Sequence, residues 1–91
     1  MTKETIPKRK DQIMTADMNG MTVMMDIETG KYYNLGTVGG RIWELLNVPV
    51  SVETLLRKLL GEYDVMPEKC EADTLPFLNA LLEWGLLTAN G

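Results

Sequence analysis

Hydrophobic and polar residues alternate along the first third of the chain. Two alternating runs, residues 12–18 and residues 21–27, stand on either side of the dipeptide Asn19-Gly20. This arrangement predicts a β-hairpin, because a type I′ turn requires a positive φ at both central positions. A second turn over residues 28–30 leads into a short strand-like run, residues 31–35. The pattern therefore predicts a three-stranded antiparallel sheet.

The two turns also predict which residues face each other across this sheet. The Asn-Gly loop pairs Met18 with Met21. A three-residue loop that ends at a left-handed Gly30 pairs Met25 with Tyr33. One face then collects the side chains of Met14, Ala16, Met18, Met21, Val23, Met25, Ile27, Tyr33 and Leu35. The other face collects Thr15, Asp17, Thr22, Met24, Asp26, Tyr32 and Asn34. Because the first face is almost wholly apolar, we expect it to form the buried side of the sheet.

After residue 36 the hydrophobic residues recur at the spacing of a helix. The first helix is predicted to begin at a Thr37 cap and to end before Pro49. Gly39 and Gly40 lie in its first turn, where they weaken the helix but permit a close approach to the sheet.

Two further helices are predicted. The second follows Ser51, which suits an N-cap. The third begins at Pro67 and is interrupted by Pro76, which should not lie deep inside a helix. Two alternatives remain open: a break followed by a new helix capped at Asp73 or Thr74, or one kinked helix.

Composition narrows the classes of function. The chain has 91 residues, enough for one domain, and it has no histidine and one cysteine, Cys70. This count excludes an intrachain disulfide and the usual Cys/His zinc site, so we expect neither metal nor cofactor. No histidine is present to activate the thiol, and no carboxylate pair is placed for acid–base chemistry, so we expect no catalytic residues. No apolar run approaches the length of a membrane span, which predicts a cytoplasmic protein without membrane contact.

Charge is distributed unevenly. Residues 1–10 carry four basic residues and one acidic residue, a net charge of +3, which leaves −7 for residues 11–91 out of the total of −4. We therefore expect residues 1–11 to be a disordered basic tail and residues 12–91 to be the folded domain. A body with a charge of −7 repels nucleic acid and anionic membranes, and it suits a basic partner.

The strand over residues 31–35 has no proline and a single charged residue, so little in it protects a sheet edge from pairing. We therefore expect a peptide from another protein to pair with it. Four groups of residues, taken in order, resemble the PqqD family, the recognition elements of ribosomally made, modified peptides. The groups are Asp26-x-x-x-Gly30-x-x-Tyr33-x-Leu35, Ile42-Trp43-Glu44-Leu45-Leu46, Tyr63-Asp64-Val65 and Asp73-x-x-x-Phe77-Leu78-x-x-Leu81-x-x-x-Gly85-Leu86-Leu87. The resemblance covers roughly residues 12–90.

The resemblance implies an α+β fold like a winged helix-turn-helix, with a three-stranded antiparallel N-terminal sheet followed by three helices. A chain of this size is most similar to the stand-alone leader-binding half of a split lasso-peptide B protein. The implied function is that of a non-catalytic adaptor. It binds the leader segment of a precursor peptide as an added β-strand and delivers it to a separate leader peptidase or other modifying enzyme. The implied leader-binding residues are Lys31, Tyr32, Tyr33, Asn34, Leu35, Asp73, Phe77, Ala80 and Leu81.

Two alternative functions remain open. One is a PqqD-type chaperone in pyrroloquinoline quinone biosynthesis. The other is a DNA-binding winged-helix protein, because that architecture is shared. The third predicted helix opposes DNA binding, because Lys69 is its only basic residue among several acidic ones and phosphate contacts need lysine or arginine.

Overall fold

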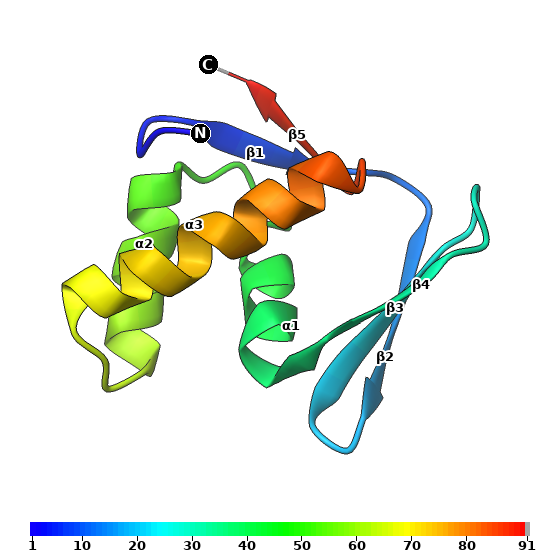
Figure 1. The fold of residues 1–91 in the computed structure, drawn as a ribbon, viewed down its shortest axis with the longest axis horizontal. Coiled ribbons are helices and arrows are strands. Elements are labelled where there is room, and N and C mark those ends of the chain that lie inside the picture. Colours follow the sequence, from blue (N-terminus) through cyan, green and yellow to red (C-terminus); the bar gives the residue numbers. More distant parts are fainter. Residues whose placement is uncertain (91) are drawn as a thin grey trace.

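The computed structural model describes residues 1–90, in which two small sheets pack with three helices (Figure 1). The elements follow in the order β1 (Ile6–Arg9), β2 (Ile13–Met18), β3 (Met21–Asp26), β4 (Tyr32–Leu35), α1 (Gly36–Leu45), α2 (Val52–Glu62), α3 (Pro67–Glu83) and β5 (Leu87–Asn90). Strands β2, β3 and β4 form an antiparallel sheet in that order, and β1 pairs with β5 in a second, two-stranded sheet. The predicted α+β fold, with a three-stranded antiparallel sheet followed by three helices, is confirmed.

The basic N-terminal segment is ordered, so the expectation of a disordered tail over residues 1–11 was wrong. Strand β1 pairs with β5 from the opposite end of the chain, with Arg9 opposite Leu87. The backbone carbonyls of Lys3 and Thr5 accept hydrogen bonds from Glu53 and Val52, in the first turn of α2. These bonds satisfy N–H groups that a helix start leaves without partners. The sequence pattern near the N-terminus did not predict strand β1, because its partner β5 lies about eighty positions away along the chain.

Strands β2 and β3 pair as the sequence predicted. Met18 lies opposite Met21 and Met14 opposite Met25, and the turn residues Asn19 and Gly20 have φ values of 58° and 83°. These values are those of the type I′ turn expected from the Asn-Gly pair.

The predicted register between β3 and β4 was wrong by one residue. Met24, not Met25, lies opposite Tyr33, because the loop closes between Asp26 and Lys31 and therefore holds four residues. A shift of one residue moves a strand's side chains to the other face of the sheet. Tyr33 therefore shares a face of the sheet with Met24, and Tyr32 shares the other face with Met25, the reverse of the prediction.

The buried face of the sheet is also the opposite of the predicted one. Met24, expected on the outward face, has no exposed surface, and Asp26 is 2% exposed. Met14 and Met18, expected in the core, are more than half exposed. Helix α1 explains the choice of face, because it packs on β3 at Gly40, where an added Cβ would overlap the Thr22 side chain. The close approach expected from Gly39 and Gly40 is thus present, and it is made to the Thr22–Met24 face.

The helices form the other half of the core. Ser51 caps α2 as predicted, since its Oγ accepts the backbone N–H of Thr54 at 3.1 Å. The predicted Thr37 cap of α1 is absent, because the chain passes directly from β4 into α1 at Gly36. The Asn34 Oδ1 accepts the Gly36 N–H at 2.9 Å in its place. Of the two alternatives for the third helix, the break is wrong, because α3 is one helix with Pro76 inside it.

Candidate peptide-binding site

Strand β4 has a backbone edge without a strand partner in the part of the chain that the structure describes. The Asp26 N–H donates to the Lys31 carbonyl at 2.9 Å, so the carbonyl of Lys31 faces β3. Because the polar backbone groups alternate in direction along an antiparallel strand, those of Tyr33 also face β3. The N–H and C=O groups of Tyr32 and Asn34 then face away from the sheet. This edge can pair with one more extended chain.

The turn that leads into β4 is held by a buried carboxylate. Asp26 accepts the backbone N–H groups of Glu28 at 3.0 Å and Thr29 at 3.3 Å, and its other oxygen lies 2.7 Å from Nζ of Lys10. The hydrogen bond from Lys10 lowers the pKa of the Asp26 carboxyl, and the same bond raises the pKa of the Lys10 amine. Both shifts favour the ionised pair, so this contact fixes the start of β4 to the segment that precedes β2.

Helix α3 presents a stripe of side chains on the β4 side of the fold. Asp73, Phe77, Ala80 and Trp84 follow at intervals of four, three and four residues, which places them on one helical face. The Trp84 ring stacks on Tyr33 with a centroid distance of 5.2 Å and an interplanar angle of 30°.

Phe77, an earlier residue of the same stripe, lies near the C-terminal end of β4. A Cβ added at Gly39 would lie 2.9 Å from Cζ of Phe77 and 3.3 Å from Cβ of Leu35. Trp84 therefore lies at the beginning of β4 and Phe77 lies near its end. It follows that β4 and α3 run in opposite directions.

The predicted site residues divide into three groups. The first group is partly exposed and shares the side of the fold between β4 and α3: Tyr33, Phe77 and Ala80. The second group is buried and supports the first from behind: Leu35 at 9% exposure and Leu81 at 0%. The third group points elsewhere or is exposed. Tyr32 is 72% exposed on the outward sheet face, and Lys31 is exposed. Asn34 is also exposed, and its Oδ1 accepts the Gly36 N–H at 2.9 Å. Asp73 is exposed and pairs with Lys69 at 3.1 Å. Leu81 is thus a supporting core residue rather than part of an accessible surface.

Trp84 is the residue that the sequence-based site missed. It is half exposed and stacked on Tyr33, so it belongs to the accessible aromatic surface. A signal for it was present in the sequence, because Trp84 stands seven residues after Phe77 and so repeats its position on a helix.

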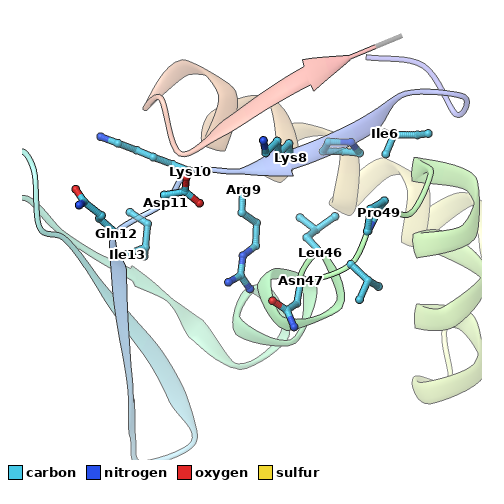
Figure 2. A pocket seen from close by; sticks show the side chains of 12 residues that line it. Ile6, Lys8, Arg9, Lys10, Asp11, Gln12, Ile13, Leu46, Asn47 and Pro49 are labelled. Carbon is cyan, nitrogen blue, oxygen red and sulfur yellow. The ribbon is translucent and has the colours of Figure 1, made fainter.

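The two described cavities lie away from the β4 edge. The larger, of about 710 Å³, is an open pocket between Ile6–Ile13 and Leu46–Pro49. In Figure 2 the Arg9 side chain reaches from β1 across this pocket toward the C-terminal end of α1, where it donates to the Trp43 carbonyl at 3.1 Å. The smaller cavity lies between α2 and the beginning of α3. The β4 site is therefore a strand edge, which suits an extended chain better than a small molecule.

Other kinds of site find little support in the described residues. Within residues 1–90, no three His, Cys, Asp or Glu side chains come together as a metal ion would require. Cys70 is buried, with its Sγ 4.0 Å from the Thr74 hydroxyl. None of the helices in residues 1–90 combines the length and apolar character needed to cross a membrane.

Comparison with known proteins identifies the family. The profile of the PqqD family, described as coenzyme PQQ synthesis protein D, matches residues 21–87. The chain therefore belongs to the PqqD family, as its motifs predicted. Among solved structures it is similar to TbiB1 in complex with the TbiA(beta) leader peptide. The identity is 34%, the TM-score is 0.77, and the alignment covers 88% of this chain and 93% of TbiB1. No curated protein matches the chain.

Proposed function

We propose that this protein is a leader-binding adaptor in the biosynthesis of a ribosomally made peptide, with lasso-peptide biosynthesis favoured. It binds the leader of the precursor as an added strand on β4 and delivers it to a separate leader peptidase or other modifying enzyme. The protein itself performs no catalysis and acts in the cytoplasm. The observation that carries this proposal is the free backbone edge of β4 beside the partly exposed aromatic side chains of Tyr33, Phe77 and Trp84.

The edge of β4 supplies the binding contacts that are common to any extended peptide. Tyr32 and Asn34 each offer one N–H donor and one C=O acceptor, and a leader strand pairs with them in the manner of strand addition. Such contacts provide affinity with little dependence on the leader's side chains. The similarity to TbiB1, whose structure contains a leader peptide, supports the binding of a leader.

Side chains of α3 supply the selectivity. A leader strand antiparallel to β4 runs in the same direction as α3, from the Phe77 end toward the Trp84 end. Alternate leader side chains then point toward Tyr33, Phe77 and Trp84, which favour apolar or aromatic partners. Asp73, one turn before Phe77, is exposed, and its surface pair with Lys69 is weak enough for it to favour a basic residue near the upstream end of the bound segment.

The direction of the leader also determines where its downstream end leaves the site. The segment that leads toward the modified part of the precursor leaves the site beside Trp84 and the β3–β4 turn. The ion pair between Lys10 and the buried Asp26 ties this turn to the segment that precedes β2.

A second candidate is a PqqD-type chaperone in pyrroloquinoline quinone biosynthesis, which the name of the matching family favours. It differs in the precursor rather than in the mode of binding. DNA binding has no comparable support, because four acidic residues on α3 outnumber its one basic residue, Lys69: they are Glu68, Glu71, Asp73 and Glu83.

A titration tests the proposed function. The protein is added to a fluorescein-labelled leader of its own precursor, and anisotropy is compared with that of a scrambled leader of equal charge. We expect saturable binding of the leader at least tenfold tighter than binding of the scrambled peptide. Equal, weak binding of both peptides would contradict the proposal.

Intrinsic fluorescence then locates the bound leader. Trp43 is 2% exposed and Trp84 is 50% exposed, so an emission change on leader addition reports on Trp84. We expect the change to be absent in Trp84→Phe, whereas the anisotropy of the labelled leader still rises.

A further inference from the structure

The larger cavity, of about 710 Å³, has no part in the proposed function. It lies between three segments of the chain: β1, the link from β1 to β2, and the connection from α1 to α2 (Figure 2). Its volume is within the range of about 300–1,000 Å³ that is usual for ligand sites. We call it the β1 pocket. No residue of β4 or α3 lines it, so a ligand held there would leave the leader edge free.

Two basic side chains at the β1 pocket have no carboxylate partner among residues 1–90. Five of the nine basic residues form ion pairs there, and neither Lys8 nor Arg9 is one of them. The lining holds three basic residues and one acidic residue, Asp11, a net charge of +2 in a chain with a total of −4. The third basic residue, Lys10, already pairs with Asp26. The pocket therefore attracts an anion mainly through Lys8 and Arg9.

The guanidinium of Arg9 is held in place by Trp43. Its Cζ lies 4.8 Å from the centroid of the Trp43 ring, and its Nη1 donates to the Trp43 carbonyl at 3.1 Å. This bond uses one of the five N–H donors that a guanidinium carries. A planar donor group that is already fixed loses little freedom when a carboxylate binds to its other N–H groups.

Apolar side chains make up most of the remaining wall. Ile6 is 45% exposed and Val48 is 51% exposed, and Ile13, Leu46 and Pro49 also line the pocket. An inorganic anion would pair with the two cations but leave this wall in contact with water. A pure hydrocarbon would cover the wall but leave the cations without a partner. The lining therefore fits a ligand that carries a carboxylate beside an apolar group.

The backbone of β1 offers little to an added strand. The Lys10 N–H donates to the Leu86 carbonyl at 2.9 Å and so faces β5. Because N–H groups alternate in direction along a strand, positions 7 and 9 face away from β5. Pro7 has no N–H, and a proline on an edge strand opposes further pairing. Recognition at the β1 pocket therefore depends on side chains, unlike recognition at β4.

We propose that the β1 pocket is a second binding site, and that it takes a short segment of a partner protein in which carboxylate and apolar side chains alternate. The carboxylates pair with Lys8 and Arg9, and the apolar side chains cover Ile6 and Val48. A long polyanion such as nucleic acid is opposed, because residues 11–91 carry a net charge of −7. A short acidic segment contacts only the positive pocket.

The second site is independent of the proposed leader-binding function. The two sites share no lining residue, so the leader and the acidic segment bind at the same time. We expect the affinity of the labelled leader to stay within about twofold when the β1 pocket is filled.

A titration with three short, fluorescein-labelled peptides tests the second site. One peptide alternates glutamate with leucine, one alternates glutamate with serine, and one alternates lysine with leucine. We expect the glutamate–leucine peptide to bind the wild-type protein at least tenfold more tightly than either of the others. In heteronuclear NMR spectra of the protein, this peptide should shift the backbone amide signals of Lys8, Arg9 and Val48 and the side-chain N–H signal of Arg9.

Matched variants separate the pocket from the overall charge. Lys8→Glu reverses an exposed charge at the pocket, and we expect it to weaken binding of the glutamate–leucine peptide at least fivefold. Lys58→Glu makes the same change at an exposed position of α2 outside the pocket, and it should stay within about twofold of wild type. Val48→Ser removes apolar contact without a change of charge and should weaken binding about threefold.

Several outcomes would overturn this proposal. They are no binding or equal binding of the three peptides, an affinity that Lys8→Glu leaves unchanged, NMR shifts confined to β4 and α3, or displacement of the labelled leader by the glutamate–leucine peptide. Failure of the leader itself to bind would instead refute the proposed function and would not affect the β1 pocket, because the peptide titration contains no leader.

Discussion

Replacing Tyr32 with proline should weaken leader binding about tenfold while the domain remains folded. Proline removes the Tyr32 N–H, which faces the free edge of β4 and would donate to a leader carbonyl. The net loss of one backbone hydrogen bond is worth about 1–1.4 kcal/mol, which corresponds to a factor of about five to ten in affinity. The fold should survive because proline is tolerated on an edge strand where the missing N–H faces solvent. Leader anisotropy measures the affinity, and circular dichroism measures the fold.

Two controls separate the backbone effect from other changes. Tyr32→Val also removes the phenol ring but keeps the N–H, so it should bind the leader more tightly than the proline variant. Thr15→Pro removes an outward N–H from the free edge of β2 and should leave leader binding unchanged. Equal affinities of Tyr32→Pro and Tyr32→Val would mean that the leader does not pair with β4.

Replacing Pro76 with alanine should raise the free energy of unfolding by about 2–3 kcal/mol. Pro76 is the tenth residue of the seventeen in α3, where it lacks the N–H of a helical hydrogen bond and crowds the carbonyl four residues earlier. Alanine removes both penalties, which together cost about 3 kcal/mol relative to proline in a helix interior. Urea unfolding followed by circular dichroism measures the change.

Pro67 provides the matched control in the same helix. It stands at the first helical position, where proline fits and no hydrogen bond is lost, so Pro67→Ala should give no gain. A gain of similar size at both positions would refute the assignment of the cost to the helix interior. Natural proteins break local rules mainly at functional sites, and Pro76 directly precedes Phe77 of the proposed site. We therefore expect Pro76→Ala to bind the leader more weakly although it is more stable.

The local signals in the sequence were sufficient for much of the fold. The Asn19-Gly20 turn, the Ser51 cap and the helical spacing of the apolar residues each depend on neighbours within a few positions, and each is present in the structure. Family motifs indicated β4 and α3 as the elements of the proposed site. Trp84 continues the helical spacing of Phe77 and Ala80, but the list of predicted site residues ended at Leu81.

The errors concern contacts that the local pattern does not specify. The loop after β3 closes one residue earlier than predicted because the Asp26 carboxylate turns inward to meet Lys10, a residue from the supposed tail. Strand β1 needs β5 as its partner, and no local signal links the two. The sheet buries its less apolar face because α1 packs at Thr22 and Gly40. A pattern that equates the most apolar face with the core is misled where a helix packs on the other face.

Amide hydrogen exchange of the leader complex tests the central claim most directly, because the β2–β3–β4 sheet has an edge on β4 and an edge on β2 that have no strand partner among residues 1–90 and serve as site and control. By the alternation of backbone groups, the N–H groups of Tyr32 and Asn34 lie on the free edge of β4, and those of Thr15 and Asp17 lie on the free edge of β2. If the leader adds to β4, exchange at Tyr32 and Asn34 slows when the leader binds, while exchange at Thr15 and Asp17 is unchanged. Slowed exchange on β2 alone, or unchanged exchange at Tyr32 and Asn34 under saturating leader, would contradict the account.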